Sequence, residues 1–239
     1  RQNNYSEKDK KDIYSLDVKD FQNFMKRLRK YIKKYCYFTN NEISYYHCGE
    51  YGEINNRPHY HALIFGYDFP DKYVWYKGKD KSKNLYRSEI LEKLWPHGNS
   101  LIGNVTYESA SYVARYVMKK INGKQQEEHY EGVTPEYATM SRGKKNAIGY
   151  RWYNKYGLSD CHNNDRVSVR TDNGTFYIKP PRYYDKLLEQ NNKVLYDKIK
   201  ETRRNETPDP VLRRFPNDRL SVKEKLQHIK LNKLIRNNI

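Results

Sequence analysis

The sequence is poor in cysteine and in acidic residues, and it has no long apolar run. Its three cysteines, Cys36, Cys48 and Cys161, show no CxxC spacing, and an odd number argues against a disulfide scaffold. No stretch approaches the roughly 18 apolar residues of a membrane span, and the first residues are polar, unlike a signal peptide. These absences predict a protein without a membrane segment that works in a reducing cytoplasm.

Two further features are missing. No GxxxxGK[ST] motif is present, so an attached ATP-driven helicase is not expected, and there is no internal repeat. The length of 239 residues suits one large domain, or one domain with an appendage. The sequence begins at Arg1 without a methionine, which suggests that the natural chain starts further upstream.

Positive charge and tyrosine are abundant. Lys and Arg number 46 against 29 Asp and Glu, a formal net charge of +17, which favours a polyanionic partner. The chain has 25 tyrosines and 7 phenylalanines, and planar rings among cations suit a surface that stacks bases and neutralises phosphates. Half-exposed strand positions also favour tyrosine, so composition alone does not identify the polyanion.

Hydrophobic periodicity predicts helices and strands along the chain. Apolar residues three and four apart make residues 17–35 an amphipathic helix, which Asp17 can cap. Two β-prone runs, 42–50 and 57–66, flank a loop with Gly, Asn and Pro and predict an antiparallel hairpin. Residues 107–121 predict a helix with one buried face. The other expected elements are a short helix at "SEILEKLW" that ends at Pro96, a strand at 99–106, an exposed basic loop at "MSRGKKNAIG", a hairpin at 166–180 with its turn at Asn173-Gly174, charged helices beyond "PPRYY", and a last helix at 220–236.

The stretch "RPHYHALIFG" opens the second strand of the first hairpin with two histidines. Alternate residues of a strand share a face, so His59 and His61 project to the same side, close enough to share one ion. A metal needs at least one further ligand, and Glu50 at the end of the partner strand is preferred over Glu53 in the loop. An HxH pair alone is more often an accident of packing, but the acidic residue across a short loop favours a metal site.

The predicted helix at 107–121 carries Tyr112 and Tyr116 four residues apart, so both phenols lie on one face. A phenol, with a pKa near ~10, is a poor nucleophile at neutral pH unless cations or a polarised electrophile assist it. Cations adjoin this row: Arg115, Lys119 and Lys120. Tyrosines at this spacing most often pack at a core edge, yet the apolar stripe already belongs to Ala110, Val113, Ala114, Val117 and Ile121. The two tyrosines are therefore expected at its border, open to a charged substrate.

At these residues the sequence resembles the HUH superfamily of single-strand DNA endonucleases, whose His-hydrophobic-His metal motif is similar to "PHYHALIFG" here. The YxxxY pair in "YVARYVMKK" is similar to that of rolling-circle replication initiators. More narrowly, four segments in order resemble the replication initiators of small single-stranded DNA phages, the gokushoviruses of the Microviridae. These segments are "FQNFMKRLRKY", "CGEYGEINNRPHYHALIFG", "LWPHGNSLIGNVTYESASYVARYVMKK" and "MSRGKKNAIG", and the similarity covers about residues 17–185.

The resemblance implies an α+β fold, the HUH endonuclease fold, in which helices pack against a central antiparallel sheet that carries the HUH strand. This domain is expected at residues 1–184, followed by a basic helical extension at 185–239 with a proline-broken linker near 205–217. Family members usually have an extended strand of hydrophobic residues and threonine before the first helix. Residues 1–16 do not supply that strand, so the chain is either truncated or divergent.

The resemblance also implies an activity, a site and partners. The expected activity is the nicking and rejoining of single-stranded origin DNA through a 5′-phosphotyrosyl intermediate, in rolling-circle replication of a small phage. The expected partners are single-stranded or supercoiled origin DNA and the host polymerase and helicase, in the cytoplasm of the bacterial host and without a membrane. The residues expected to act are the ligands of Mg²⁺ or Mn²⁺ His59, His61 and Glu50, the alternating nucleophiles Tyr112 and Tyr116, the neighbouring Lys119 and Lys120, and the DNA contacts Arg57, Arg115, Arg142, Lys144 and Lys145.

Two alternatives remain open. One is a non-catalytic basic nucleic-acid-binding protein, in which the two histidines are structural. The other is a related HUH transposase or relaxase, although such enzymes more often carry one catalytic tyrosine. The basic helix near the C-terminus is more often a solvated face than a DNA contact.

Overall fold

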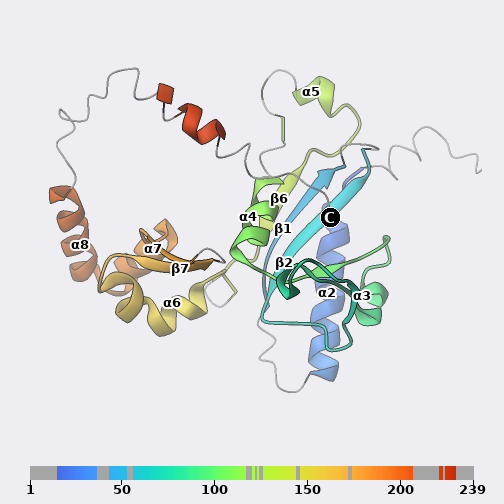
Figure 1. The fold of residues 1–239 in the computed structure, drawn as a ribbon, viewed down its shortest axis with the longest axis horizontal. Coiled ribbons are helices and arrows are strands. Elements are labelled where there is room, and N and C mark those ends of the chain that lie inside the picture. Colours follow the sequence, from blue (N-terminus) through green and yellow to red (C-terminus); the bar gives the residue numbers. More distant parts are fainter. Residues whose placement is uncertain are drawn as a thin grey trace, which may run out of the picture. The chain divides into compact units, whose positions relative to one another are not determined.

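The computed structural model describes residues 15–36, 43–52, 56–116, 120–121, 123, 126–143, 146–171, 174–206, 221–222 and 224–229. The chain divides into two compact units. The first contains the described residues of Arg1–Cys161 and Arg166–Ile178, and the second those of His162–Asp165 and Lys179–Ile239. Within the described ranges, no helix is long and apolar enough to cross a membrane. Antiparallel sheets and helices together confirm the expected α+β class (Figure 1).

An antiparallel three-stranded sheet lies at the centre of the first unit's packing. Its strands are β1 (Ser44–Tyr51), β2 (Pro58–Phe65) and β6 (Tyr137–Met140), in the order β2-β1-β6. β1 and β2 confirm the hairpin expected from residues 42–50 and 57–66, with Glu50 opposite His59. The sequence reading had no strand at β6, which pairs with the other side of β1.

The HUH strand, β2, is an edge strand among the described residues, so its expected central position does not hold for this part of the chain. Gly66 gives the physical reason, because its φ of 93° is a left-handed conformation that turns the chain away where β2 ends. The next strands are β3 (Tyr73–Tyr76), β4 (Leu85–Arg87) and β5 (Ile102–Gly103). They pair with one another in a second sheet, in the order β3-β4-β5.

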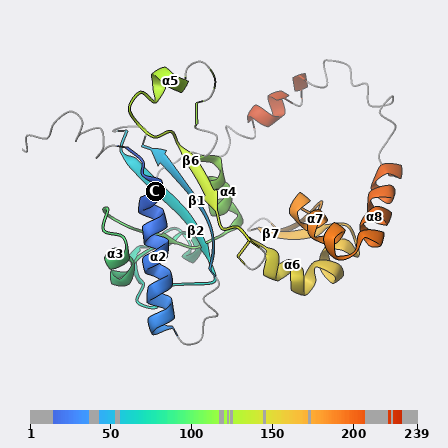
Figure 2. The same ribbon diagram turned by 180° about the vertical axis from the view of Figure 1, so that it is seen from behind.

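Helices cover both faces of the first sheet, α2 (Val18–Tyr35) on one face and α4 (Tyr107–Arg115) on the other (Figures 1 and 2). Asp17 caps α2 as expected, because its carboxylate accepts a hydrogen bond of 2.8 Å from the backbone N–H of Lys19. Burying each large apolar side chain of α2 contributes about 1.5–3 kcal/mol. These side chains are Phe21, Phe24, Met25, Leu28 and Ile32.

Beneath α2, the sheet buries a histidine. The His47 side chain is 1% exposed and stacks on Phe21 with ring centroids 3.6 Å apart. Its Nδ1 lies 3.4 Å from Thr139 Oγ1, and its Nε2 has no hydrogen-bond partner within the described part of the chain. Burial lowers the pKa of His47 to about 3, because the imidazolium would lose its hydration there.

Mild acid should therefore destabilise the first unit through His47. The imidazole titrates near ~6.5 in the unfolded chain and at about 3 in the folded one, so between these values the unfolded state binds the extra proton. Stability that is present above pH ~6.5 is lost as the pH falls, at up to about 1.4 kcal/mol per pH unit. His47→Gln cannot titrate and should flatten this slope in urea unfolding followed by circular dichroism. Equal slopes for the two proteins would contradict the assignment.

The remaining elements of the first unit include two that were expected. Helix α3 (Glu89–Leu94) confirms the short helix, and β7 (Val167–Thr171) pairs with β8 (Gly174–Ile178) to confirm the hairpin. The strand expected at 99–106 is reduced to β5. The sequence reading did not identify β3, β4, the single turn α5 (Gln126–His129), or α6 (Tyr150–Tyr156) with the π-helical turn Gly157–His162 that follows it.

The second unit contains the expected charged helices, α7 (Arg182–Asn191) and α8 (Lys193–Asn205). Arg203 of α8 joins two carboxylates, because its Nε donates to Asp165 over 2.6 Å and its Nη1 donates to Asp185 over 2.8 Å. This pair of contacts ties residues 162–165 to both helices. The expected domain boundary at residue 184 falls inside α7. Residues 221–222 and 224–229 of the expected last helix are helical, and most of the expected linker near 205–217 lies outside the described residues.

Candidate active site

The β1–β2 hairpin places a buried carboxylate against one of the two predicted histidines. Directly opposed residues of antiparallel strands share a face, so Glu50 lies beside His59, and Cys48 lies beside His61. The Glu50 residue is 5% exposed, and its Oε1 lies 3.0 Å from His61 Nε2. The hairpin thus brings together two of the three predicted metal ligands.

His59 lies on the same face, at the exposed end of the strand. Its Nδ1 is 2.8 Å from the carbonyl oxygen of Arg57, so that nitrogen donates to the backbone and Nε2 keeps the lone pair. Metal-binding histidines are commonly oriented by such a bond. The loop makes room for this ring at Gly52, where a Cβ atom would come within 2.7 Å of His59 Cε1. A side chain at position 52 would therefore displace the imidazole.

A complete ligand set is not preassembled. Within the ranges that the structure describes, no three His, Cys, Asp or Glu side chains form a group that could hold a metal ion. Glu50 and His61 are in contact, whereas the ring of His59 is held by the Arg57 carbonyl. The donor types nevertheless fit a divalent cation, since two imidazoles and a carboxylate are common ligands of such ions. The alternative acid, Glu53, lies outside the described residues.

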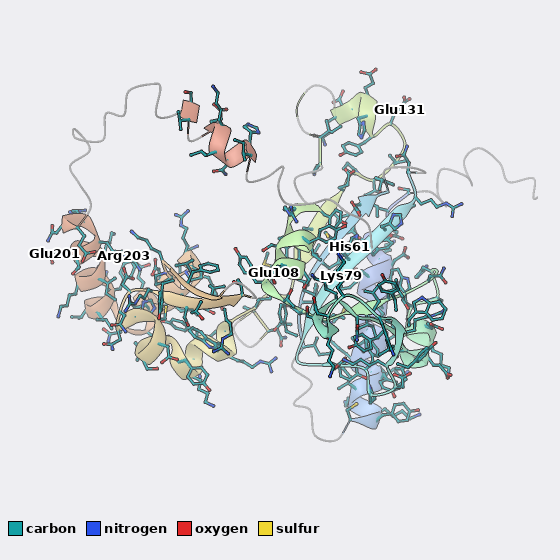
Figure 3. All side chains as sticks on the ribbon, in the orientation of Figure 1. His61, Lys79, Glu108, Glu131, Glu201 and Arg203 are labelled. Carbon is teal, nitrogen blue, oxygen red and sulfur yellow. The ribbon has the colours of Figure 1, made fainter. Side chains whose placement is uncertain are left out.

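Helix α4 is anchored at its start by a capping box. The Thr106 side chain accepts a bond of 3.2 Å from the Ser109 backbone N–H, and Ser109 Oγ accepts one of 2.8 Å from the Thr106 N–H. Further along, Val113 packs on Cys48 and Leu63 of the sheet. The helix therefore presents its last turn to the face that carries Glu50 and His61, and Figure 3 shows His61 beside the helix that begins near Glu108.

Both predicted tyrosines meet His61. The ring of Tyr116 stacks on the imidazole, with centroids 4.3 Å apart and planes 11° apart, and Tyr112 approaches edge-on at 6.4 Å. The Tyr116 hydroxyl donates a short hydrogen bond to the Tyr112 hydroxyl. A hairpin and a helix that are far apart in the sequence thus bring two phenols, an imidazole and a carboxylate together. We call Glu50, His61, Tyr112 and Tyr116 the tyrosine cluster.

The two phenols differ in burial, which corrects the expectation that both border the apolar stripe. Tyr116 is 8% exposed and belongs to the core with Val113, whereas Tyr112 is only partly buried. Positions 113 and 116 are three residues apart and share the side of the helix that faces the sheet. Ala114, which was expected in the stripe, is exposed. Leu63 and Phe65 pack in this core, as expected.

The electrostatics also distinguish the two tyrosines. Burial raises the pKa of Tyr116 well above the ordinary phenol value, and its bond to Tyr112 and the charge of Glu50 raise that pKa further. Tyr116 therefore stays neutral and acts as a hydrogen-bond donor. Tyr112 has a cation beside it, because the Arg115 guanidinium lies 5.8 Å from the centre of the Tyr112 ring. That guanidinium is positioned by its Nε, which donates to the Ser111 carbonyl over 3.2 Å.

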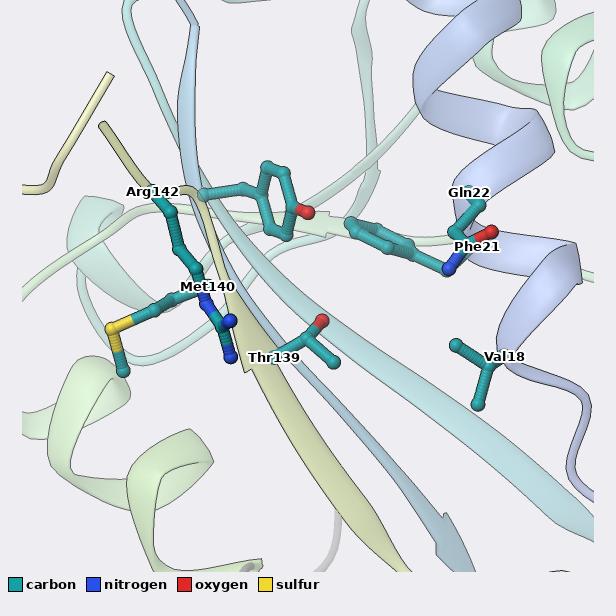
Figure 4. A pocket seen from close by; sticks show the side chains of 7 residues that line it. Val18, Phe21, Gln22, Thr139, Met140 and Arg142 are labelled. Atoms are coloured by element: carbon teal, nitrogen blue, oxygen red, sulfur yellow. The ribbon is translucent and has the colours of Figure 1, made fainter. Parts of the chain in front are cut away.

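The other predicted DNA contacts lie in different places. Arg57 is exposed in the loop beside His59, and Lys120 is partly buried beyond the end of α4. Arg142 lines a pocket of about 310 Å³ between α2, β1 and β6 (Figure 4). The other residues of that pocket are Val18, Phe21, Gln22, Tyr45, Thr139 and Met140, so Arg142 is separate from the tyrosine cluster. Lys119, Lys144 and Lys145 lie outside the described residues.

The sequence reading missed Cys48 as part of this site. Cys48 is fully buried opposite His61, and its Sγ lies 3.6 Å from the carbonyl oxygen of Val113. A small side chain here lets α4 approach the sheet closely enough for Tyr116 to stack on His61. Its position two residues before Glu50, on the same strand face, was the available signal.

Comparison with known proteins gives a consistent family. The model of a family described as replication-associated protein ORF2 matches residues 4–121. Replication-associated protein VP4 of Bdellovibrio phage phiMH2K is 34% identical over 175 residues, which cover 72% of this chain and 52% of the relative. Replication-associated protein ORF2 of Spiroplasma virus 4 is 32% identical over 184 residues, which cover 75% of this chain and 53% of the relative.

A third relative, replication-associated protein ORF4 of Chlamydia phage 1, is 34% identical over 108 residues, 44% of this chain and 26% of the relative. The chain spans about half the length of the first two relatives. No solved structure matches it. The family match of residues 4–121 includes the β1–β2 hairpin and α4, the elements that build the tyrosine cluster. The chain therefore belongs to the family of phage replication-associated proteins.

Proposed function

We propose that this chain nicks single-stranded origin DNA and later rejoins it, as the initiator of rolling-circle replication in a small phage. One observation carries the proposal: two tyrosine hydroxyls are hydrogen-bonded to each other beside a buried Glu50–His61 pair. The family of the chain and its net charge of +17 support a DNA substrate. The same residues support assigning the HUH endonuclease fold to the first unit.

The proposed reaction is a transesterification. The oxygen of one tyrosine attacks the scissile phosphorus, a P–O bond to tyrosine forms, and the bond to the 3′ oxygen breaks. The phenol's proton is balanced by the proton that the 3′ oxygen gains, so the products are a 5′-phosphotyrosyl adduct and a free 3′-hydroxyl. The host polymerase would extend that hydroxyl. The second tyrosine then attacks the regenerated junction, and the first strand is rejoined without ATP because the bond energy is conserved.

The geometry favours Tyr112 as the first nucleophile. Tyr112 is the more accessible phenol, and its oxygen accepts the hydrogen bond that Tyr116 donates. A donor at that oxygen stabilises the negative charge that develops before attack. The Arg115 guanidinium near the Tyr112 ring adds to this effect. Tyr116 would act in the second transfer, after the first phenol has been consumed.

Glu50, His61 and His59 would hold a divalent cation such as Mg²⁺ or Mn²⁺. The contact of 3.0 Å between Glu50 and His61 supports this assignment, as does the backbone bond that leaves His59 Nε2 with its lone pair. When bound, the cation would withdraw charge from the scissile phosphate. The loop basic residue Arg57 would contact the DNA backbone, and the host helicase would supply single strand in the host cytoplasm.

The test is a search for the covalent adduct on a random pool of single-stranded oligonucleotides. With a 3′ label, a labelled protein band should survive boiling in detergent, because the 5′-phosphotyrosyl bond keeps the 3′ part of the DNA on the protein. A 5′ label should give no such band. EDTA should remove the band and excess Mn²⁺ should restore it. Absence of any adduct from the 3′-labelled pool with Mn²⁺ would contradict the proposal.

A further inference from the structure

The β3–β4 hairpin exposes a row of large side chains. Each residue of β3, Tyr73, Val74, Trp75 and Tyr76, is exposed, and Trp75 and Tyr76 are 59% and 60% exposed. None of them contributes to the hydrophobic core. Soluble proteins rarely expose contiguous apolar surface unless it binds something. The strand is therefore a candidate binding surface, and it is separate from the tyrosine cluster.

Trp75 is held in position while most of its surface stays open. The pairing of β3 with β4 shifts between Val74 and Tyr76, so Trp75 is skipped as at a β-bulge, a feature that redirects a side chain. The Arg87 guanidinium lies 4.8 Å from the centre of the indole ring. Arg87 is itself fixed, because its Nε donates to Glu92 over 2.7 Å. An anchored cation thus stacks on the indole, which remains 59% exposed.

The charge around these rings is strongly positive. Residues 72–87 contain six Lys and Arg residues and one Asp. Lys77, Lys79 and Lys81 follow β3 and are exposed, and Lys83 pairs with Asp80 over 3.4 Å. Exposed rings interleaved with cations suit unpaired nucleic acid, because bases stack on the rings while the cations meet phosphates. Duplex DNA offers its bases no such access.

The hairpin is joined to the helix that carries the tyrosines. Asn104 Nδ2 donates to the carbonyl oxygen of Lys81, at the β3–β4 turn, over 3.1 Å. The carbonyl oxygen of Asn104 in turn accepts a bond of 3.0 Å from Ser109 Oγ, in the first turn of α4. A DNA strand bound along the hairpin would therefore lie next to the start of α4. This places the hairpin within reach of the nucleotides that flank the nick.

We propose that the β3–β4 hairpin is a binding platform for single-stranded DNA, with one base stacked on Trp75 and neighbouring nucleotides held by Tyr73, Tyr76 and the lysines. The role of this strand as the flank of a nicked origin rests on the proposed function. The affinity for single strand rests on the hairpin alone. The two can therefore be tested apart.

The test measures binding of a fluorescent oligothymidylate of about 20 nucleotides to the full chain by anisotropy. Trp75→Ala should raise the dissociation constant about tenfold, because stacking on one base is lost, while Trp75→Phe should stay within about threefold. Trp152→Phe, on α6, is the matched control and should bind as wild type. Oligothymidylate should also quench indole emission in wild type, and less so in Trp75→Ala.

The outcomes separate the platform from the nicking activity. The double variant Tyr112→Phe/Tyr116→Phe should bind oligothymidylate as wild type does, although it forms no adduct. A failed adduct assay together with the tenfold loss in Trp75→Ala would thus overturn the proposed function and support the platform. Equal affinity of Trp75→Ala and wild type would overturn the platform, including if a protein is its true partner. Equal competition by an oligothymidylate–oligoadenylate duplex would also overturn it.

Discussion

Replacing both Tyr112 and Tyr116 with phenylalanine should abolish the covalent DNA adduct, a loss on the order of a thousandfold or more. Phenylalanine keeps the ring that stacks on His61 and removes only the hydroxyl, so the fold should survive. The measurement is the labelled protein band on a denaturing gel. Circular dichroism of the double variant would confirm folding. An unchanged band would exclude these two residues from the chemistry.

The single variants should differ from each other, because the two phenols are placed differently. Tyr112→Phe should slow the first nick strongly while leaving residual adduct through Tyr116. Tyr116→Phe should keep the first nick and lose the second transfer, so that circular single strands no longer form from a substrate with two origins. Tyr107→Phe is a matched control, since Tyr107 begins α4 and is 50% exposed. Equal first-nick rates in the two single variants would contradict the proposed order.

Glu50→Gln should weaken Mn²⁺ binding on the order of a hundredfold and reduce adduct formation in parallel. The amide is nearly isosteric with the carboxylate and can still bond His61, but it lacks the negative charge that holds a divalent cation. Because outer-shell changes alone cost 10–100-fold in metal affinity, loss of a direct ligand should reach the upper end of that range. Titration calorimetry with Mn²⁺ in the absence of DNA measures this directly.

Glu108→Gln is the matched control for this charge change. Glu108 lies in the first turn of α4 and is exposed, so it removes the same charge from the same unit without touching the Glu50–His61 pair. Its Mn²⁺ affinity should equal that of wild type. If Glu50→Gln bound Mn²⁺ as tightly as the control, Glu50 would not be a ligand. A loss of adduct without a loss of Mn²⁺ affinity would point instead to a direct role of the carboxylate on the tyrosines.

The sequence was sufficient where one local period dominates. The apolar spacing of residues 17–35 and the capping position of Asp17 predicted α2, and two alternating runs around a Gly/Asn/Pro loop predicted the β1–β2 hairpin. Because strand alternation fixes which side chains share a face, the closeness of Glu50 to the histidine pair also followed from spacing. The four-residue interval likewise placed Tyr112 and Tyr116 in contact.

The rest depended on tertiary contacts that no local pattern encodes. Strand β6 has four residues and is stable only because β1 offers a free side to pair with. β3 is exposed at every position, so it lacks the alternation that reveals a half-buried strand. The burial of Tyr116 depends on how far α4 rotates over Cys48 and Leu63, which helical spacing leaves undetermined. The position of β2 at the sheet edge depends on the turn at Gly66.

The guanidinium of Arg203 has a practical consequence for anyone who wishes to shorten this protein. The second unit is discontinuous in sequence, since it contains His162–Asp165 as well as the segment from Lys179 onward. A chain terminated after Ile178 would retain Asp165 while discarding Arg203 and Asp185, stranding a carboxylate whose counterion has been removed. A minimal nuclease fragment should therefore neutralise position 165, for instance as Asp165→Asn, or keep the chain through Asn205.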